Sequence, residues 1–231
     1  MLILGLDSSA VAGSCALCEV NGGKTQLIAE SFINTKQTHS QTLMPMAENM
    51  MKSVGLGFDK LDRIAVTSGP GSFTGVRIGV AAAKGLGYAL GIPCVGVSAL
   101  HAAALGLAGF EGLICAVMDA RRSQFYNALF SAKGGILERI TPDRAISAED
   151  LEKELAKYQE KIYLAGDGAE LAKRLLAKTD TVLAPSALRF PKASSVCIAS
   201  QEYEALTAAE LMPVYLRLPQ AERERLERES K

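Results

Sequence analysis

The sequence predicts an α/β protein in which one βββαβαβ unit occurs twice. The apolar runs and turn residues of the first half recur in the same order in the second half. Two landmarks also recur at one offset. Asp7 and Asp119, which each end a first strand, are 112 positions apart. The glycines at 22–23 and at 134–135, which each supply a hairpin turn, are separated by the same 112 positions. A shared offset at two independent landmarks favours duplication over coincidence.

The first half predicts three strands, a helix, a strand, a second helix and a final strand. The opening apolar run ends at Asp7, and residues 21–24 supply turn residues before the third strand. Apolar residues at 43, 47, 50 and 54 have the spacing of one helical face. The expected strands are 2–6, 12–19, 27–33, 63–67 and 93–97, and the expected helices are 39–54 and 75–90.

The second half follows a helix expected over 99–107. Its first strand ends at Asp119, and Ser147 is placed to cap a charged helix. The expected strands are 113–118, 124–130, 136–140, 162–165 and 181–183, and the expected helices are 147–158, one opened by 166–168, and a closing helix over 192–206. We therefore expect one lobe over 1–105, a second over 106–215 and a charged tail over 216–231.

Composition places the chain among globular proteins. Of 231 residues, 48% are hydrophobic and 22% are charged, which excludes wholesale disorder. The 25 basic residues are balanced by 25 acidic ones, so no overall positive field exists to hold nucleic acid directly. The apolar run at the N-terminus has no basic residues before it and meets Asp7 early, and no stretch reaches the ~20 apolar residues of a membrane span. We expect a cytoplasmic protein with no membrane contact.

The cysteines and histidines favour no metal site. Cys15 and Cys18 form the single CxxC pattern, and residues three apart on a strand point to opposite faces of a sheet. This favours buried core cysteines over a redox pair or half of a zinc site. His39 has no histidine partner at metal-ligand spacing, and neither has His101.

A glycine-rich loop, 68–75, lies between a predicted strand and the start of a predicted helix. Free backbone amides and the helix dipole at such a position favour an anion. Gly69 and Gly71 match the start of a GxGxxG pattern, but Thr74 stands in place of the third glycine and no GK[ST] follows. The loop is therefore either a tight backbone turn or an anion site, and spacing alone does not decide.

Asp7 and Asp119 each end the first strand of a half, where two lobes present carboxylates across a cleft. Ser8 and Ser9 after Asp7 suit a phosphate, whereas the arginines at 121–122 after Asp119 disfavour a metal ion. The alternative is that each aspartate only caps the end of its strand.

The segment Gly96-Val97-Ser98-Ala99-Leu100 nearly matches the GxSxG turn of hydrolases, but Leu100 stands at the required glycine. We expect Ser98 to cap the next helix instead, because a hydrolase base approaches in space and not from three residues along the same helix.

Two predicted helices carry more apolar surface than one buried face needs. In 39–54 the methionines at 44, 46 and 51 lie off the main stripe, and in 75–90 only Arg77 and Lys84 are charged. Such surfaces, rich in methionine and small residues, suit partner docking. The alternative is a pair of helices enclosed by the protein's own lobes.

The segments LGLDSS, HSQTLMP, TSGPGSFTGVRIG, GLGYALGIPCVGVSAL and VMDARRSQFY together resemble the bacterial TsaB (YeaZ) family of tRNA threonylcarbamoyladenosine biosynthesis proteins. The resemblance runs through roughly residues 1–130, with 68–79 as its most specific part. It implies a two-lobed actin-like fold of the RNase-H type (ASKHA), in agreement with the duplicated βββαβαβ pattern.

The resemblance implies a non-catalytic partner that forms a heterodimer with TsaD and recruits the ATPase TsaE, while TsaD modifies adenosine 37 of tRNA. It also implies a homodimer when the chain is alone, and contact with tRNA only through the complex. The helices implied as the partner interface contain Leu43, Ala47, Met50, Ile78, Ala81 and Ala82.

The resemblance leaves room for a weak or vestigial ATP or ADP site, with no cofactor required and no metal. Such a site would contain Asp7, Ser8, Gly69, Gly71, Gly166 and Gly168. The alternative function is an independent actin-like phosphotransferase or ATPase. It requires a complete phosphate and metal set, and the Asp119-Ala120-Arg121 segment departs from the ATPase pattern.

Overall fold

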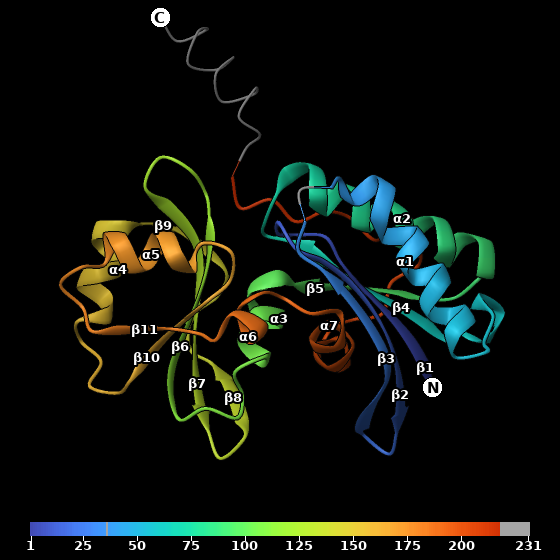
Figure 1. Ribbon diagram of the computed structural model, residues 1–231, viewed down its shortest axis with the longest axis horizontal. Helices are drawn as coiled ribbons and strands as arrows, with labels where there is room; N and C mark the ends of the chain where they lie inside the picture. Colours follow the sequence, from blue (N-terminus) through green and yellow to red (C-terminus); the bar gives the residue numbers. More distant parts are fainter. Residues whose placement is uncertain (36, 218–231) are drawn as a thin grey trace, which may run out of the picture.

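The computed structural model describes residues 1–35 and 37–217 and consists of two β-sheets with helices on both faces of each (Figure 1). We call the first sheet and its helices the first lobe, and the second sheet and its helices the second lobe. Residues 218–231 of the expected tail lie outside the described part of the chain.

The first sheet has the strand order β3-β2-β1-β4-β5. Its strands are β1 (Leu2–Asp7), β2 (Gly13–Asn21), β3 (Lys24–Ile33), β4 (Arg63–Gly69) and β5 (Cys94–Ser98). The first three strands pair antiparallel as a meander, and β4 and β5 continue the sheet parallel to β1. The carboxyl ends of β1, β4 and β5 therefore meet at one edge.

The second sheet has the order β11-β10-β6-β7-β8. Its strands are β6 (Gly112–Asp119), β7 (Gln124–Lys133), β8 (Ile136–Arg139), β9 (Arg144–Ser147), β10 (Ile162–Ala165) and β11 (Thr181–Leu183). Apart from β9, the order and directions match those of the first sheet strand for strand. The predicted duplication and the two-lobed actin-like fold are confirmed. The sequence reading missed β9, which pairs with the first half of β7 while β8 pairs with its end.

Helices cover both faces of each sheet (Figure 1). They are α1 (His39–Ser53), α2 (Phe73–Leu90), α3 (Ala99–Leu105), α4 (Ala148–Leu155), α5 (Ala169–Leu175), α6 (Ser186–Arg189) and α7 (Ala193–Ala199), with 3-10 turns at Phe58–Lys60 and Ser200–Glu202. On the outer faces, α1 and α2 pack on the first sheet, and α4 and α5 on the second. Between the sheets, α7 packs on the first sheet and α3 contacts both.

The central helix α3 joins the two lobes. Ala102 belongs to the core between α3, α7 and the first sheet, whereas Leu100 and Ala103 belong to the core against the second sheet. Because all three side chains are fully buried, the lobes share a continuous apolar interior at this helix.

The closing helix predicted over 192–206 is shorter than expected. It ends at Ala199, a 3-10 turn follows, and Leu206 then pairs with Cys94 of β5 as an isolated bridge. The boundary prediction placed 106–215 in the second lobe, but α7 packs on the first sheet, and Leu206 and Leu211 after it also belong to the first lobe. Gly5 permits this contact, because a Cβ there would lie 2.4 Å from the Ala193 carbonyl oxygen.

The CxxC prediction is confirmed. Cys15 faces the core under α1 and α2, and Cys18 faces the opposite core under α7. All five cysteines are free and buried. Within the described residues, no helix is long and apolar enough to cross a bilayer.

Candidate functional site

Polar residues from both lobes gather where the parallel strands of each sheet end. In the first lobe, Asp7 ends β1, and its Oδ1 accepts hydrogen bonds from the Ser9 amide (3.1 Å), the Ser9 hydroxyl (2.7 Å) and the Thr67 hydroxyl (2.6 Å). The other oxygen, Oδ2, is buried without a partner. Burial raises the pKa of Asp7, and the hydrogen bonds oppose that rise. Asp7 is therefore mainly an organiser of the turn after β1.

Ser8 points beneath α2. Its hydroxyl donates to the Gly75 carbonyl oxygen at 2.8 Å, and the side chain is fully buried. Gly75 and Gly79 make room for it, since Cβ atoms there would lie 2.1 Å from the Ser8 carbonyl oxygen and 2.6 Å from its Oγ. The Ser8 hydroxyl is thus already used in packing the loop against the helix.

The four glycines of the expected nucleotide site all lie against backbone of their own chain. Cβ atoms at Gly69 and Gly71 would lie 2.3 Å and 2.4 Å from the carbonyl oxygens of Val214 and Ser9. In the second lobe, Cβ atoms at Gly166 and Gly168 would lie 2.1 Å from the Val117 carbonyl oxygen and 2.9 Å from the Asp119 amide nitrogen. Close internal packing explains these glycines, and a nucleotide at this edge stays a prediction.

The sequence reading missed Asp167, which lies between two of these glycines. Burial raises the pKa of its carboxyl to about 6, and the charges of Asp119 and Asp7 act in the same direction. Its Oδ1 has no hydrogen-bond partner. Asp119 itself pairs with Arg121, whose amide lies 2.7 Å and guanidinium 3.2 Å from it. Among the residues that the structure describes, no three metal-ligating side chains are arranged to hold an ion.

Ser98 caps α3 as predicted, with its hydroxyl accepting the His101 amide at 3.2 Å. The His101 ring lies 3.1 Å from the Tyr203 hydroxyl through Nδ1 and stacks on Phe130 at 5.6 Å. Burial lowers the pKa of His101. The histidine thus belongs to the contact between the lobes, and its ring makes no hydrogen bond to Ser98 of the kind that nucleophilic catalysis requires.

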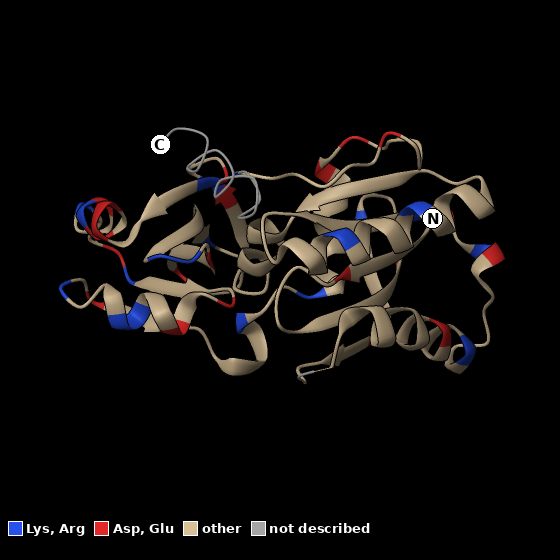
Figure 2. Ribbon diagram, turned by 90° about the horizontal axis from the view of Figure 1, so that it is seen from above, with Lys and Arg blue, Asp and Glu red and all other residues tan. Residues whose placement is uncertain are grey.

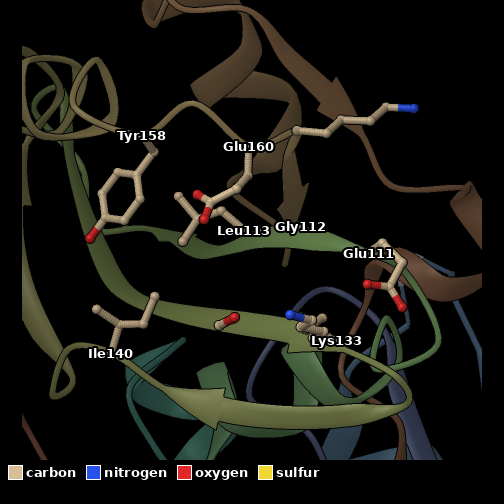
Figure 3. A pocket seen from close by; sticks show the side chains of 10 residues that line it. Glu111, Gly112, Leu113, Lys133, Ile140, Tyr158 and Glu160 are labelled. Carbon is tan, nitrogen blue, oxygen red and sulfur yellow. The ribbon is translucent and has the colours of Figure 1, made fainter.

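A hollow of about 390 Å³ lies at the opposite end of the second sheet (Figure 3). Leu113 forms part of its floor, and Lys133, Tyr158 and Glu160 stand around it. None of the residues predicted for a site lines this hollow.

Three residues predicted for the partner interface are buried in the protein's own core. Leu43, Ala47 and Met50 of α1 pack on the first sheet and are at most 4% exposed. The interface prediction is wrong for these three, because the stripe with helical spacing covers the sheet.

The outer face of α2 differs from that of α1 in having almost no charge. Ala81 is exposed as predicted, while Ile78 and Ala82 are half-buried against the core of the first lobe. The exposed face continues through Gly85, Ala89 and Tyr88, whose side chain is 86% exposed. Sequence reasoning missed Tyr88, although its position seven residues after Ala81 on one helix was the available signal.

The two charged residues of α2 bind a segment close to the C-terminal end of the described chain. Lys84 donates to the carbonyl oxygens of Ala209 (2.9 Å) and Leu211 (2.8 Å), and Arg77 donates to the Tyr215 hydroxyl at 2.7 Å. Both charges are therefore used within the chain, which leaves an exposed helix face made of small residues and a tyrosine. Elsewhere, charges of both signs are dispersed over the two lobes (Figure 2).

A family model and a curated relative both concern the threonylcarbamoyl modification of adenosine in tRNA. Residues 26–224 match the family model described as TsaD, tRNA N6-adenosine threonylcarbamoyltransferase. The tRNA threonylcarbamoyladenosine biosynthesis protein TsaB of Bacillus subtilis is 34% identical over 96% of both chains. The solved structure of YeaZ from Pseudomonas aeruginosa is 24% identical, with a TM-score of 0.77 over 93% of this chain and 99% of that one.

A second solved structure, an uncharacterised protein with similarity to peptidase YeaZ from Pseudomonas aeruginosa, is 25% identical. Its TM-score is 0.75 over 94% of this chain and 99% of that chain. In the present chain, the serine of the hydrolase-like segment caps a helix, so this segment gives no support to a peptidase reaction.

Proposed function

The chain belongs to the TsaB family of tRNA threonylcarbamoyladenosine biosynthesis proteins, and we propose that it serves that pathway as a non-catalytic partner subunit. Its role is to bind a TsaD-like catalytic chain, and the heterodimer then recruits a TsaE-like ATPase. The tRNA is reached only through the complex, in keeping with equal numbers of acidic and basic residues. The role requires no cofactor and no membrane contact.

The observation that carries the proposal is the outer face of α2. Ala81, Gly85, Tyr88 and Ala89 are exposed on one helix whose two cations are held by other parts of the same chain. Small residues let a second helix approach closely, and an exposed tyrosine is a frequent anchor at interfaces. An uncharged helix face of this kind favours a protein partner over solvent.

A TsaD-like chain suits this face because the TsaD family model covers most of the present sequence. Two related chains can pair through equivalent helices about an approximate two-fold axis, as two identical chains do about an exact one. A second copy of this chain then competes for the same face, which accounts for a homodimer when the partner is absent.

The packing at the strand ends supports the non-catalytic part of the proposal. The Ser8 hydroxyl is committed to Gly75, and the glycines at the strand ends touch the chain's own backbone. An actin-like phosphotransferase or ATPase requires free groups at these positions to hold phosphate and metal. Turnover of ATP by the purified chain alone would contradict this part.

The test is Ala81→Glu, measured as heterodimer formation with the TsaD-like protein of the same organism by calorimetry and light scattering. A carboxylate left buried and unpaired in a helix contact should weaken association by about a hundredfold or more. Ala82→Glu is less suitable because that side chain also touches the first-lobe core. Ala177→Glu, at an exposed alanine of the second lobe, is the matched control. Equal affinity for both variants would remove α2 from the interface.

A further inference from the structure

The chain after α7 forms a C-terminal strap, residues 206–217, that is anchored on the first lobe. Leu206 and Cys94 exchange backbone hydrogen bonds of 2.8 Å in both directions. Leu211 is buried in the core beneath α2. The start of the strap is therefore a fixed part of the first lobe.

Side chains of α2 hold the strap along the helix. Lys84 binds two of its carbonyl oxygens, at Ala209 and Leu211. Closer to the start of α2, the Arg77 guanidinium lies 3.9 Å from the centre of the Phe73 ring, and Tyr215 packs on Phe73 at 5.1 Å. Arg77 thus lies over the Phe73 ring and donates to the Tyr215 hydroxyl, which holds this part of the strap beside the start of α2.

The strap then crosses from the first lobe to the second, over the edge where both sheets have their strand ends (Figure 1). The Val214 amide donates to the Ser68 carbonyl oxygen at 2.7 Å, and Gly69 leaves room for the Val214 carbonyl. Three residues later, Arg217 Nη1 donates to the Ala120 carbonyl oxygen at 3.1 Å. Ala120 directly follows the last residue of β6.

We propose that the strap is a latch that holds the two lobes together at this edge. The central helix α3 joins the lobes deep between the sheets, whereas the strap joins them at the edge where the strands end. Two attachments at different depths restrict a hinge rotation that either one alone would permit. Within the described residues, Arg217 supplies the strap's hydrogen bond to the second lobe. Because breaking this bond disturbs no strand or helix, the latch can open without unfolding either lobe.

The test compares the full chain with versions that end at Leu211 or at Arg217. Spin labels on cysteines introduced at Gln26 and Ala177, one exposed position in each lobe, report the distance between lobes by pulsed electron resonance. The native cysteines are buried and stay unlabelled. The chain ending at Leu211 should give a longer and broader distance distribution, and the chain ending at Arg217 should match the full chain. Identical distributions for all three would overturn the proposal.

Two substitutions provide the same test without truncation. Val214→Pro removes the amide that donates to Ser68, and Arg217→Met removes the hydrogen bond to Ala120 while keeping the aliphatic stem. The double variant should broaden the distance distribution as the chain ending at Leu211 does. Val214→Ala with Arg217 intact keeps both hydrogen bonds and should leave the distribution unchanged. An unchanged distribution in the double variant would contradict the latch.

Discussion

The Ser8 hydroxyl donates to the Gly75 carbonyl oxygen at 2.8 Å and joins the end of β1 to the first turn of α2. The contact is possible because neither Gly75 nor Gly79 has a side chain that would occupy the position of Ser8. The same helix carries the proposed partner surface on its opposite side. The loop, the end of β1 and the partner surface are thus mechanically connected through α2.

Replacing two glycines of α2 with alanine should change the free energy of unfolding in opposite directions. A Cβ at Gly75 would lie 2.1 Å from the Ser8 carbonyl oxygen, so Gly75→Ala should lower the free energy of unfolding by about 2 kcal/mol or more. A Cβ at Gly85 meets nothing within 4 Å, so Gly85→Ala should raise it by about 0.5–1 kcal/mol through helix propensity. Urea denaturation measures both. Equal effects would contradict the packing of Ser8 beneath α2.

Asp167 should make stability depend on pH. Its pKa is raised to about 6 in the folded chain from 3.8, so the folded state binds the proton more tightly, and stability falls as pH rises between these values. Asp167→Asn removes this penalty. Its gain in free energy of unfolding over the wild type should be larger at about pH 7.5 than at about pH 4, by about 1–3 kcal/mol. A gain independent of pH would show that burial does not perturb this carboxyl.

Arg144 should be a main support of the second lobe. It donates to Asn127 Oδ1 at 3.0 Å and pairs with Glu154 at 2.7 Å, and Asn127 is fully buried. Arg144→Met leaves the Asn127 oxygen without this donor, so we expect a loss of about 2–3 kcal/mol in the free energy of unfolding. Arg174→Met, at an exposed arginine of α5, is the control and should change it by less than about 0.5 kcal/mol. Chemical denaturation distinguishes the two, and equal losses would count against the buried network.

Tyr88 should contribute to binding and not to folding. Since its side chain is 86% exposed, Tyr88→Ala should change the free energy of unfolding by less than about 0.5 kcal/mol. The affinity for the TsaD-like partner should fall about tenfold or more, as for an aromatic anchor at an interface. Ile136→Ala, at an exposed isoleucine of β8, is the control. Calorimetry with both variants gives the comparison, and an unchanged affinity for Tyr88→Ala places this residue outside the interface.

The sequence was sufficient to predict the duplicated fold because its signals are local and repeated. Asp7 and Asp119 end equivalent strands, and Ser98 and Ser147 each cap the helix that the pattern predicts. The strand β9 was not predicted because it is short and pairs with one part of β7 while β8 pairs with another. Its pairing depends on tertiary contacts and not on periodicity.

The functional residues were harder to predict, since one pattern serves two purposes. Helical spacing identified Leu43, but the same spacing describes a stripe that covers the protein's own sheet. A glycine such as Gly69 allows the backbone of Val214 to approach closely, and the same lack of a side chain would allow a phosphate to approach. The contact of Lys84 with Leu211 joins residues 127 positions apart, which no local pattern indicates.

The most direct test of the central claim is nucleoside mass spectrometry of tRNA from cells depleted of this protein. The partner-subunit account predicts loss of threonylcarbamoyladenosine, restored by the wild-type chain and by Ala177→Glu but not by Ala81→Glu. Unchanged modification after depletion would contradict a role in the pathway. Full restoration by Ala81→Glu would contradict docking through α2.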